Sequence, residues 1–290
     1  MAIKSVMSVF RRSATAIVVV LACVNINILA NPWDILPTPL QVLQEAGIER
    51  DPQAIQAVLL DDQRDPELRL ESALALAQLE HRESVPVLIQ AIDEEIHEVR
   101  FGAITALIYM PSTEAVPKLC SVVHSSRDER SRRQAVTALS QTDSRLATQC
   151  IVDVAVNENE SLRTRRSAVR VLWKIKATVE SVDGLVPLLE SQDTELRALT
   201  ALCLHRSYSG SRAIQESLGI TDSLVSATQD SELYDDIFYL VIRALEASSG
   251  QVFVDEVIQP QRGRQFLEYF AANRYLVAED VRLWSESRKR

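Results

Sequence analysis

A segment rich in helix-forming residues recurs five times along this chain at an almost constant interval. Aligned on their first apolar or small position, the copies are 31, 32, 33 and 32 residues apart, starting at Leu68, Val99, Ser131, Thr164 and Leu196. Within each copy, apolar or small residues recur at the spacing of one face of an α-helix, and the alternation of a strand is absent. Because such a repeat cannot bury its apolar face alone, consecutive copies must stack and share a core.

A second apolar run follows each of the first four copies, at residues 85–91, 116–123, 151–156 and 185–189. Three of these runs contain a proline near the start, at Pro86, Pro117 and Pro187, where the first-turn amides of a helix need no partner. The repeat is therefore predicted to be a helix, a short turn and a second helix. The predicted fold class is all-α: an α-solenoid, a right-handed superhelix of about six to seven antiparallel helix pairs.

Residues 64–92, RDPELRLESALALAQLEHRESVPVLIQAI, resemble a short HEAT-type repeat of the subclass found in phycobilin lyases. In that subclass an acidic turn leads into Val-Arg and spaced alanines, and Val-Pro opens the second helix. Residues 93–123 match this pattern, whereas the third and fourth copies lack the Val before Arg and the fifth lacks Val-Pro. The resemblance covers residues 64–220. It implies a solenoid but no particular function, because the same repeat serves lyases, scaffolds and adaptor subunits.

The N-terminal residues have the order of charge and hydropathy that is typical of an export signal. Lys4, Arg11 and Arg12 precede an uncharged run over residues 13–30, and no acidic residue occurs before Asp34. We therefore expect an exported protein, either periplasmic or secreted.

Three fates are open for this segment. Its apolar part is shorter than the roughly 20 residues of a membrane-spanning helix, which favours a signal peptide, residues 1–30, that is cleaved after Ala30. The run from Val20 to Cys23 also resembles a bacterial lipoprotein box, which would place a lipid on Cys23. An uncleaved signal anchor is the third possibility. Attachment to a membrane is thus expected only through an uncleaved N-terminus or a lipidated Cys23.

The remainder of the chain divides by composition. Residues 31–63 are predicted to be a Pro-rich leader and an N-terminal helix pair, residues 64–220 the HEAT-like repeats, and residues 221–290 degenerate C-terminal repeats or a cap. Nine of the fifteen aromatic residues lie between Tyr234 and Trp284, as expected for bulky filler that closes the end of a stack. Helical spacing there predicts one helix within 234–245 and two more, at 266–275 and 278–290.

Charge is distributed unevenly. The formal net charge of −9 becomes −12 without the three basic residues of the signal, which argues against binding of nucleic acid or anionic membranes. Residues 127–176 are the exception, because they contain eleven Lys or Arg against six Asp or Glu. A basic segment therefore lies in the middle of an acidic chain.

Arginine follows the first position of every copy. The family resemblance implies that these arginines pair with acidic turn residues of an adjoining repeat. The arginines are Arg69, Arg100, Arg132, Arg165 and Arg197, and the candidate acids are Asp65, Asp93, Asp128 and Asp193.

Further arginines occur in the third and fourth copies alone. Arg130 and Arg133 have equivalents one repeat later at Arg163 and Arg166. The planar guanidinium group suits carboxylate or phosphate partners, which makes these four the candidate partner-binding residues. A solvated charged face is the more ordinary explanation, because surface arginines are common in helices.

Nothing in the sequence points to catalysis. The glycine-rich nucleotide motifs, GxSxG and CxxC are missing, and the four histidines are dispersed. We therefore predict no catalytic residue, no cofactor and no metal. Cys120, Cys150 and Cys203 fall on apolar helix faces, where small buried thiols are expected.

The sequence favours an exported, non-enzymatic scaffold whose concave face, lined by the second helices, holds another protein or peptide, and not nucleic acid. The alternative is an auxiliary protein of the bilin-lyase or chaperone type that acts on a tetrapyrrole-bearing partner. The export signal disfavours that alternative, because the known work of the family is intracellular.

Overall fold

The computed structural model describes residues 37–175, 177–231, 233–249, 251, 253 and 264–288. In these residues every regular element is a helix and none is a strand, so the predicted all-α class is confirmed. The predicted signal peptide, residues 1–30, lies outside them. The chain divides into two compact units, Met1–Val122 with Thr137–Thr142 and Val123–Val136 with Asp143–Arg290. They are called the N-terminal and C-terminal units below.

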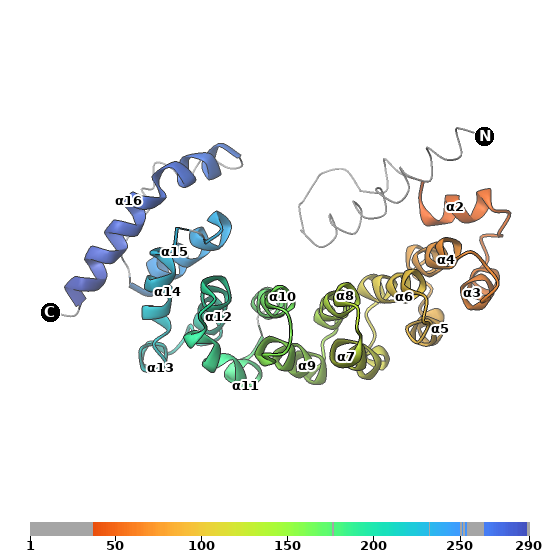
Figure 1. Cartoon of the computed structure of the whole chain (residues 1–290), viewed down its shortest axis with the longest axis horizontal. Helices are drawn as coiled ribbons and strands as arrows, with labels where there is room; N and C mark the ends of the chain where they lie inside the picture. The colour runs from red at the N-terminus through yellow and green to blue at the C-terminus, as the bar shows by residue number, and fades with distance from the viewer. Residues whose placement is uncertain are drawn as a thin grey trace. The chain divides into compact units, whose positions relative to one another are not determined.

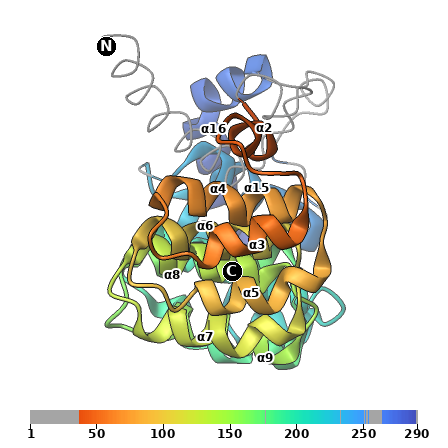
Figure 2. The same cartoon turned by 90° about the vertical axis from the view of Figure 1, so that its right-hand side faces the viewer.

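The N-terminal unit is built from paired helices (Figure 1). In chain order these are α2 (Pro39–Glu45), α3 (Pro52–Leu60), α4 (Pro66–Gln78), the 3-10 turn η2 (Arg82–Ser84), α5 (Val85–Ala91), α6 (His97–Tyr109), η3 (Thr113–Ala115) and most of α7 (Val116–Ser125). The first helices α4 and α6 pack against each other, and the second helices α3 and α5 pack beneath them (Figure 2). Leu76, Leu88 and Ile104 lie fully buried between the two rows.

Local sequence explains where these helices begin. α2, α3 and α4 each start with proline, whose missing amide costs nothing in the first turn. The residue before each proline accepts a hydrogen bond from a first-turn amide; these residues are Thr38, Asp51 and Asp65. Such caps are typically worth about 1 kcal/mol each.

Gly102 allows α6 to approach α4 closely. A Cβ atom at this position would lie 3.0 Å from the Cα atom of Leu70 and 3.2 Å from its carbonyl oxygen. Backbone atoms cannot move aside cheaply, so Gly102→Ala is expected to lower the free energy of unfolding by about 1–3 kcal/mol, despite the better helix propensity of alanine. Urea denaturation checks this. Gly210→Ala is the control, because nothing lies within 4 Å of a Cβ at Gly210. An increase in stability of Gly102→Ala would contradict the packing argument.

The C-terminal unit is also built from paired helices. Its helices are the start of α8 (Glu129–Ser140), α9 (Arg145–Val156), α10 (Leu162–Lys174), α11 (Val179–Val182), the 3-10 helix η4 (Asp183–Glu190), α12 (Thr194–Ser207), α13 (Arg212–Ser217), α14 (Ile220–Thr228), α15 (Asp235–Ser249) and α16 (Arg264–Arg288). α10, a first helix, packs against α9, the second helix of the preceding repeat. It also packs against α12, the first helix of the following repeat. α12 in turn packs against η4, α14 and α15.

Two predicted elements differ in the structure. Residues 185–189 belong to the 3-10 helix η4, with Pro187 inside it, and not to an α-helix that proline opens. Proline has no amide for the α-helical bond and clashes with the preceding turn. The two helices predicted at 266–275 and 278–290 form one helix, α16, because neither glycine nor proline interrupts residues 264–288.

The expectation that all three cysteines after the predicted signal are buried thiols holds for one of them. Cys203 is free and buried, as predicted, whereas Cys120 and Cys150 are each disulfide-bonded. Helical periodicity correctly places a cysteine on the face of a helix. It carries no information on whether a second sulfur comes within the short distance that a disulfide requires.

Candidate functional site

The arginine that follows the first position of each repeat has the same role in all five copies. Its guanidinium donates a hydrogen bond to a backbone carbonyl at or just after the end of the preceding helix. The pairs are Arg69 with Leu59 (2.8 Å), Arg100 with Glu94 (3.2 Å), Arg132 with Ser126 (2.8 Å), Arg165 with Ala155 (2.9 Å) and Arg197 with Ser191 (2.5 Å). The last carbonyls of a helix lack partners within it. Each arginine therefore satisfies a carbonyl near the end of the preceding helix and joins that helix to its own.

An acidic turn of the adjoining repeat does pair with Arg69, through Glu94, and with Arg132, through Glu160, but the four candidate aspartates are not the partners. Asp65, Asp128 and Asp193 instead cap the following helix by accepting hydrogen bonds from the amides of Glu67, Ser131 and Leu196. Asp93 pairs with Lys118. An aspartate before a helix satisfies first-turn amides, so an acidic turn does not by itself indicate an ion pair with the next repeat.

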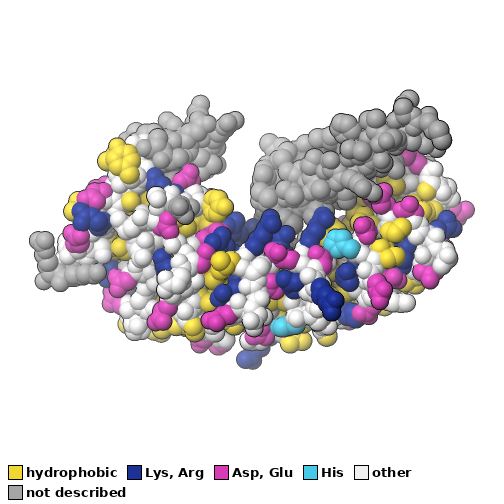
Figure 3. Space-filling view, in the orientation of Figure 1, with side chains coloured by type: hydrophobic (Ala, Val, Ile, Leu, Met, Phe, Trp, Pro, Cys, Tyr) yellow, Lys and Arg dark blue, Asp and Glu magenta, His cyan; other side chains and the backbone are white. Residues whose placement is uncertain are grey.

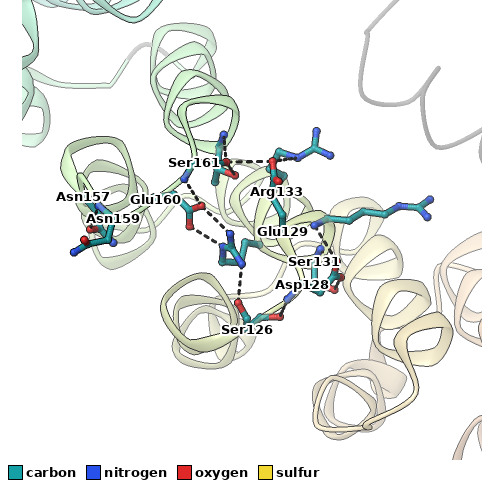
Figure 4. Close-up of polar contacts among 12 residues, drawn as sticks. Ser126, Asp128, Glu129, Ser131, Arg133, Asn157, Asn159, Glu160 and Ser161 are labelled. Atoms are coloured by element: carbon teal, nitrogen blue, oxygen red, sulfur yellow. Dashed lines mark hydrogen bonds and ion pairs between the residues drawn. The ribbon is translucent and has the colours of Figure 1, made fainter. Parts of the chain in front are cut away.

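The ion pair of Arg132 involves Glu160, in the turn before α10 (Figure 4). Two nitrogens of Arg132 contact the two carboxylate oxygens at 2.7 and 2.8 Å. The hydrogen bond to Glu160 raises the pKa of Arg132 despite burial. Burial alone would raise the pKa of Glu160, but the hydrogen bonds from Arg132 and the amide of Ser161 keep that pKa below its ordinary value. The pair thus stays ionised and fixes the start of α8 to the start of α10.

The four candidate binding residues all lie in the C-terminal unit, on α8 and α10, but they are not equivalent. Arg130 and Arg163 are exposed. Within the described ranges, the side chain of Arg163 makes no hydrogen bond or ion pair. The Nε atom of half-buried Arg133 lies 3.7 Å from Oε1 of Glu129. Figure 4 shows Glu129 between Arg133 and Ser161, whose hydroxyl lies 3.1 Å from the same carboxylate oxygen.

Arg166 belongs to an ion-pair network between α10 and α12. Its Nε atom donates to Asp193 at 2.9 Å, and its Nη1 atom lies 2.6 Å from Glu195. Arg170 contacts Glu195 at 3.0 Å. The hydrogen bond to Asp193 raises the pKa of Arg166, while hydrogen bonds from Arg166 and the amide of Leu196 hold the pKa of Asp193 down against its burial. Arg166 therefore braces two repeats, contrary to the expectation of a surplus guanidinium.

The structure adds residues that the comparison of repeats missed. Arg163, Arg166, Arg170 and Lys174 follow one another along one side of α10, at intervals of three or four residues. Ala168 and Leu172, on the other side of the helix, are fully buried. We call these four basic residues the α10 stripe. The spacing was present in the sequence, but Arg170 and Lys174 have no equivalents in the preceding copy and so did not stand out.

The stripe ends beside a tryptophan. Arg206 of α12 donates a hydrogen bond to the carbonyl of Trp173 at 3.1 Å and lies 5.3 Å from the centre of its ring. Figure 3 shows Lys and Arg side chains gathered over α8, α10 and α12. The first helices of consecutive repeats thus form a basic surface in the C-terminal unit.

Metal-ligating side chains are not clustered in the part of the chain that the structure describes. No three His, Cys, Asp or Glu side chains among them are grouped so that they could hold a metal ion. Burial raises the pKa of Cys203 to about 12, which keeps the thiol protonated. Within the same residues, no helix is long and apolar enough to cross a bilayer.

The sequence model of HEAT repeats matches residues 52–140, 97–164 and 116–205, which together cover more than half of the 290 residues. The chain belongs to the HEAT-repeat family. No curated protein has a matching sequence. The HEAT repeats account for the stacked helix pairs.

Three solved structures illustrate the likeness in fold. An engineered protein is 17% identical, over 69% of this chain and 99% of its own, with a TM-score of 0.48. A designed armadillo repeat protein in complex with the peptide (KR)4 is 18% identical, over 68% and 99%, with a TM-score of 0.47. The complex of CpcE and CpcF of phycocyanin lyase from Nostoc sp. is 15% identical, over 80% and 94%, with a TM-score of 0.44.

Proposed function

We propose that this HEAT-repeat protein is an exported, non-enzymatic scaffold that binds another protein through the basic surface of α8 and α10. The observation that carries the proposal is the α10 stripe, a row of cations on the side of α10 opposite its core. Such a row within an otherwise acidic chain attracts a complementary, acidic surface. The proposed contacts are the exposed Arg130 and Arg163, with the half-buried Arg133 and Arg166 behind them.

The proposed binding face differs from the one expected from the sequence. The second helices were expected to line it, whereas the candidate residues lie on the first helices. The second-helix row of the C-terminal unit, α9 and η4, contains no comparable run of basic residues.

Two observations support export. The N-terminal sequence has the charge and apolar order of an export signal. Cys120 and Cys150 are disulfide-bonded, and structural disulfides are typical of oxidising compartments. The same cysteines weigh against a tetrapyrrole alternative in which a thiol of this chain takes part. Two of the three cysteines in question are oxidised and Cys203 is buried.

The proposal is tested by site-specific photo-crosslinking in the source cells. A photoreactive phenylalanine analogue would replace Arg163 on α10 or, as a control, the equally exposed Arg145 at the start of α9. We expect a discrete adduct with one partner protein from position 163, in the exported fraction, and none from position 145. Retention of the chain in the cytosol, or identical adduct patterns at both positions, would refute the proposed role.

A further inference from the structure

We infer that the α10 stripe binds an acidic segment of the partner, in extended conformation, with carboxylates in contact with Arg163, Arg170 and Lys174. This inference rests on the proposed function and adds the chemistry of the bound segment. It commits to acidic side chains because the stripe offers cationic donors along its length. Arg163, Arg170 and Lys174 contact the bound segment, whereas Arg166 is a positioning residue.

The unused donors of the stripe are the first argument. Arg166 directs all three of its guanidinium nitrogens at Asp193 and Glu195, so it has little left to offer a ligand. Arg170 contacts Glu195 through Nη2, and 39% of its side chain is exposed. Arg163 and Lys174 are exposed, and within the described ranges neither makes an ion pair. Four cations therefore face two carboxylates, and the excess charge lies at the two ends of the stripe.

The charge of the surroundings is the second argument. Residues 127–176 carry eleven Lys or Arg against six Asp or Glu, whereas the whole chain has a formal net charge of −9. An acidic protein that concentrates its cations on one surface repels an acidic ligand everywhere else and steers it to that surface.

The dimensions agree with a short peptide. Lys174 lies eleven positions after Arg163, and a helix rises 1.5 Å per residue, so the stripe is roughly 16 Å long. An extended peptide advances about 3.3 Å per residue and would lay about five residues along it. Side chains on one side of such a peptide alternate with those on the other, so two or three carboxylates could face the stripe. Trp173 and Arg206 at its end would contact the apolar stem of the last one.

The inference is tested with the full chain and a fluorescein-labelled peptide of four Glu-Gly pairs, by fluorescence anisotropy at low ionic strength. The test variant is Arg163→Glu with Lys174→Glu, which reverses the charge at both ends of the stripe. The control is Arg82→Glu with Arg145→Glu, which changes the net charge equally at exposed arginines of η2 and α9. We expect about tenfold weaker binding by the test variant and less than about twofold by the control, and affinity that falls as salt is added.

Several results would overturn the inference. If both double variants lost the same affinity for the Glu-Gly peptide, the net charge of the protein alone would explain the binding. A peptide of four Lys-Gly pairs that binds as tightly, or a single-stranded oligonucleotide that binds more tightly, would show that the surface does not select carboxylates. Unchanged thermal unfolding of the test variant confirms that only the surface has altered. If the peptide fails to bind while the crosslink from position 163 forms, the scaffold function stands and only the acidic nature of its ligand is wrong.

Discussion

Replacement of Arg69 by alanine is expected to destabilise the N-terminal unit by about 2–5 kcal/mol, because a fully buried side chain is removed and the groups that it contacts lose a partner. Arg69 is fully buried, with 0% of its side chain exposed. Its Nε atom donates to the carbonyl of Leu59 at 2.8 Å, and its Nη2 atom lies 2.7 Å from Glu94. Without the guanidinium, the carbonyl of Leu59 loses this hydrogen bond, a cavity is left, and the partly exposed carboxylate of Glu94 loses its ion pair.

Two further variants separate the causes of this loss. Arg69→Met retains much of the apolar volume of the side chain, so together with Glu94→Gln it should restore much of the stability, since an apolar residue often replaces a buried ion pair at little cost. Arg100→Ala is the matched control from the next repeat. Arg100 is half-buried and makes a single longer bond, of 3.2 Å, to the carbonyl of Glu94. Arg100→Ala should lower the free energy of unfolding by about 1 kcal/mol. Urea denaturation gives the free energies, and a similar loss in both alanine variants would contradict the importance of complete burial.

Arg69 also shows where sequence reasoning reached its limit. The spacing of apolar residues predicted the five first helices, because a helix face that must be buried repeats every three to four residues. The conserved position of arginine within each copy was equally visible. Its partner was not, because the turn that supplies a carbonyl or a carboxylate depends on how two repeats stack.

The candidate surface illustrates the same limit. A comparison of repeats drew attention to Arg130, Arg133, Arg163 and Arg166, which share positions in two copies. The structure divides them by environment, because Asp193 and Glu195 of the next repeat neutralise Arg166. Arg170 and Lys174 have no counterparts in the preceding copy, although the helical spacing that joins them to Arg163 could have been found in the sequence alone.

Phe238→Ala is expected to cost the C-terminal unit about 3–5 kcal/mol, as for other fully buried aromatic side chains. Phe238 of α15 has 0% exposure, and the guanidinium carbon of Arg274, from α16, lies 4.4 Å from the centre of its ring. Arg274 also donates to the carbonyl of Asp230 and pairs with Asp235 at 3.1 Å. The ring of Phe238 therefore fills the core around α15 and also contacts Arg274, which links α16 to the rest of the unit.

This double role predicts a coupling between the two residues. Arg274→Ala alone should cost about 1–2 kcal/mol and should release α16, so that limited proteolysis cuts within Arg264–Arg288 before the rest of the unit. Because Phe238→Ala removes the surface on which Arg274 rests, the double variant should lose about 0.5–1 kcal/mol less than the sum of the single variants. Phe238→Leu keeps much of the apolar volume but has no aromatic face. It should therefore remove most of the coupling energy between positions 238 and 274 while lowering the free energy of unfolding less than Phe238→Ala does. Strict additivity of Phe238→Ala and Arg274→Ala would mean that the ring of Phe238 contributes nothing to the position of Arg274.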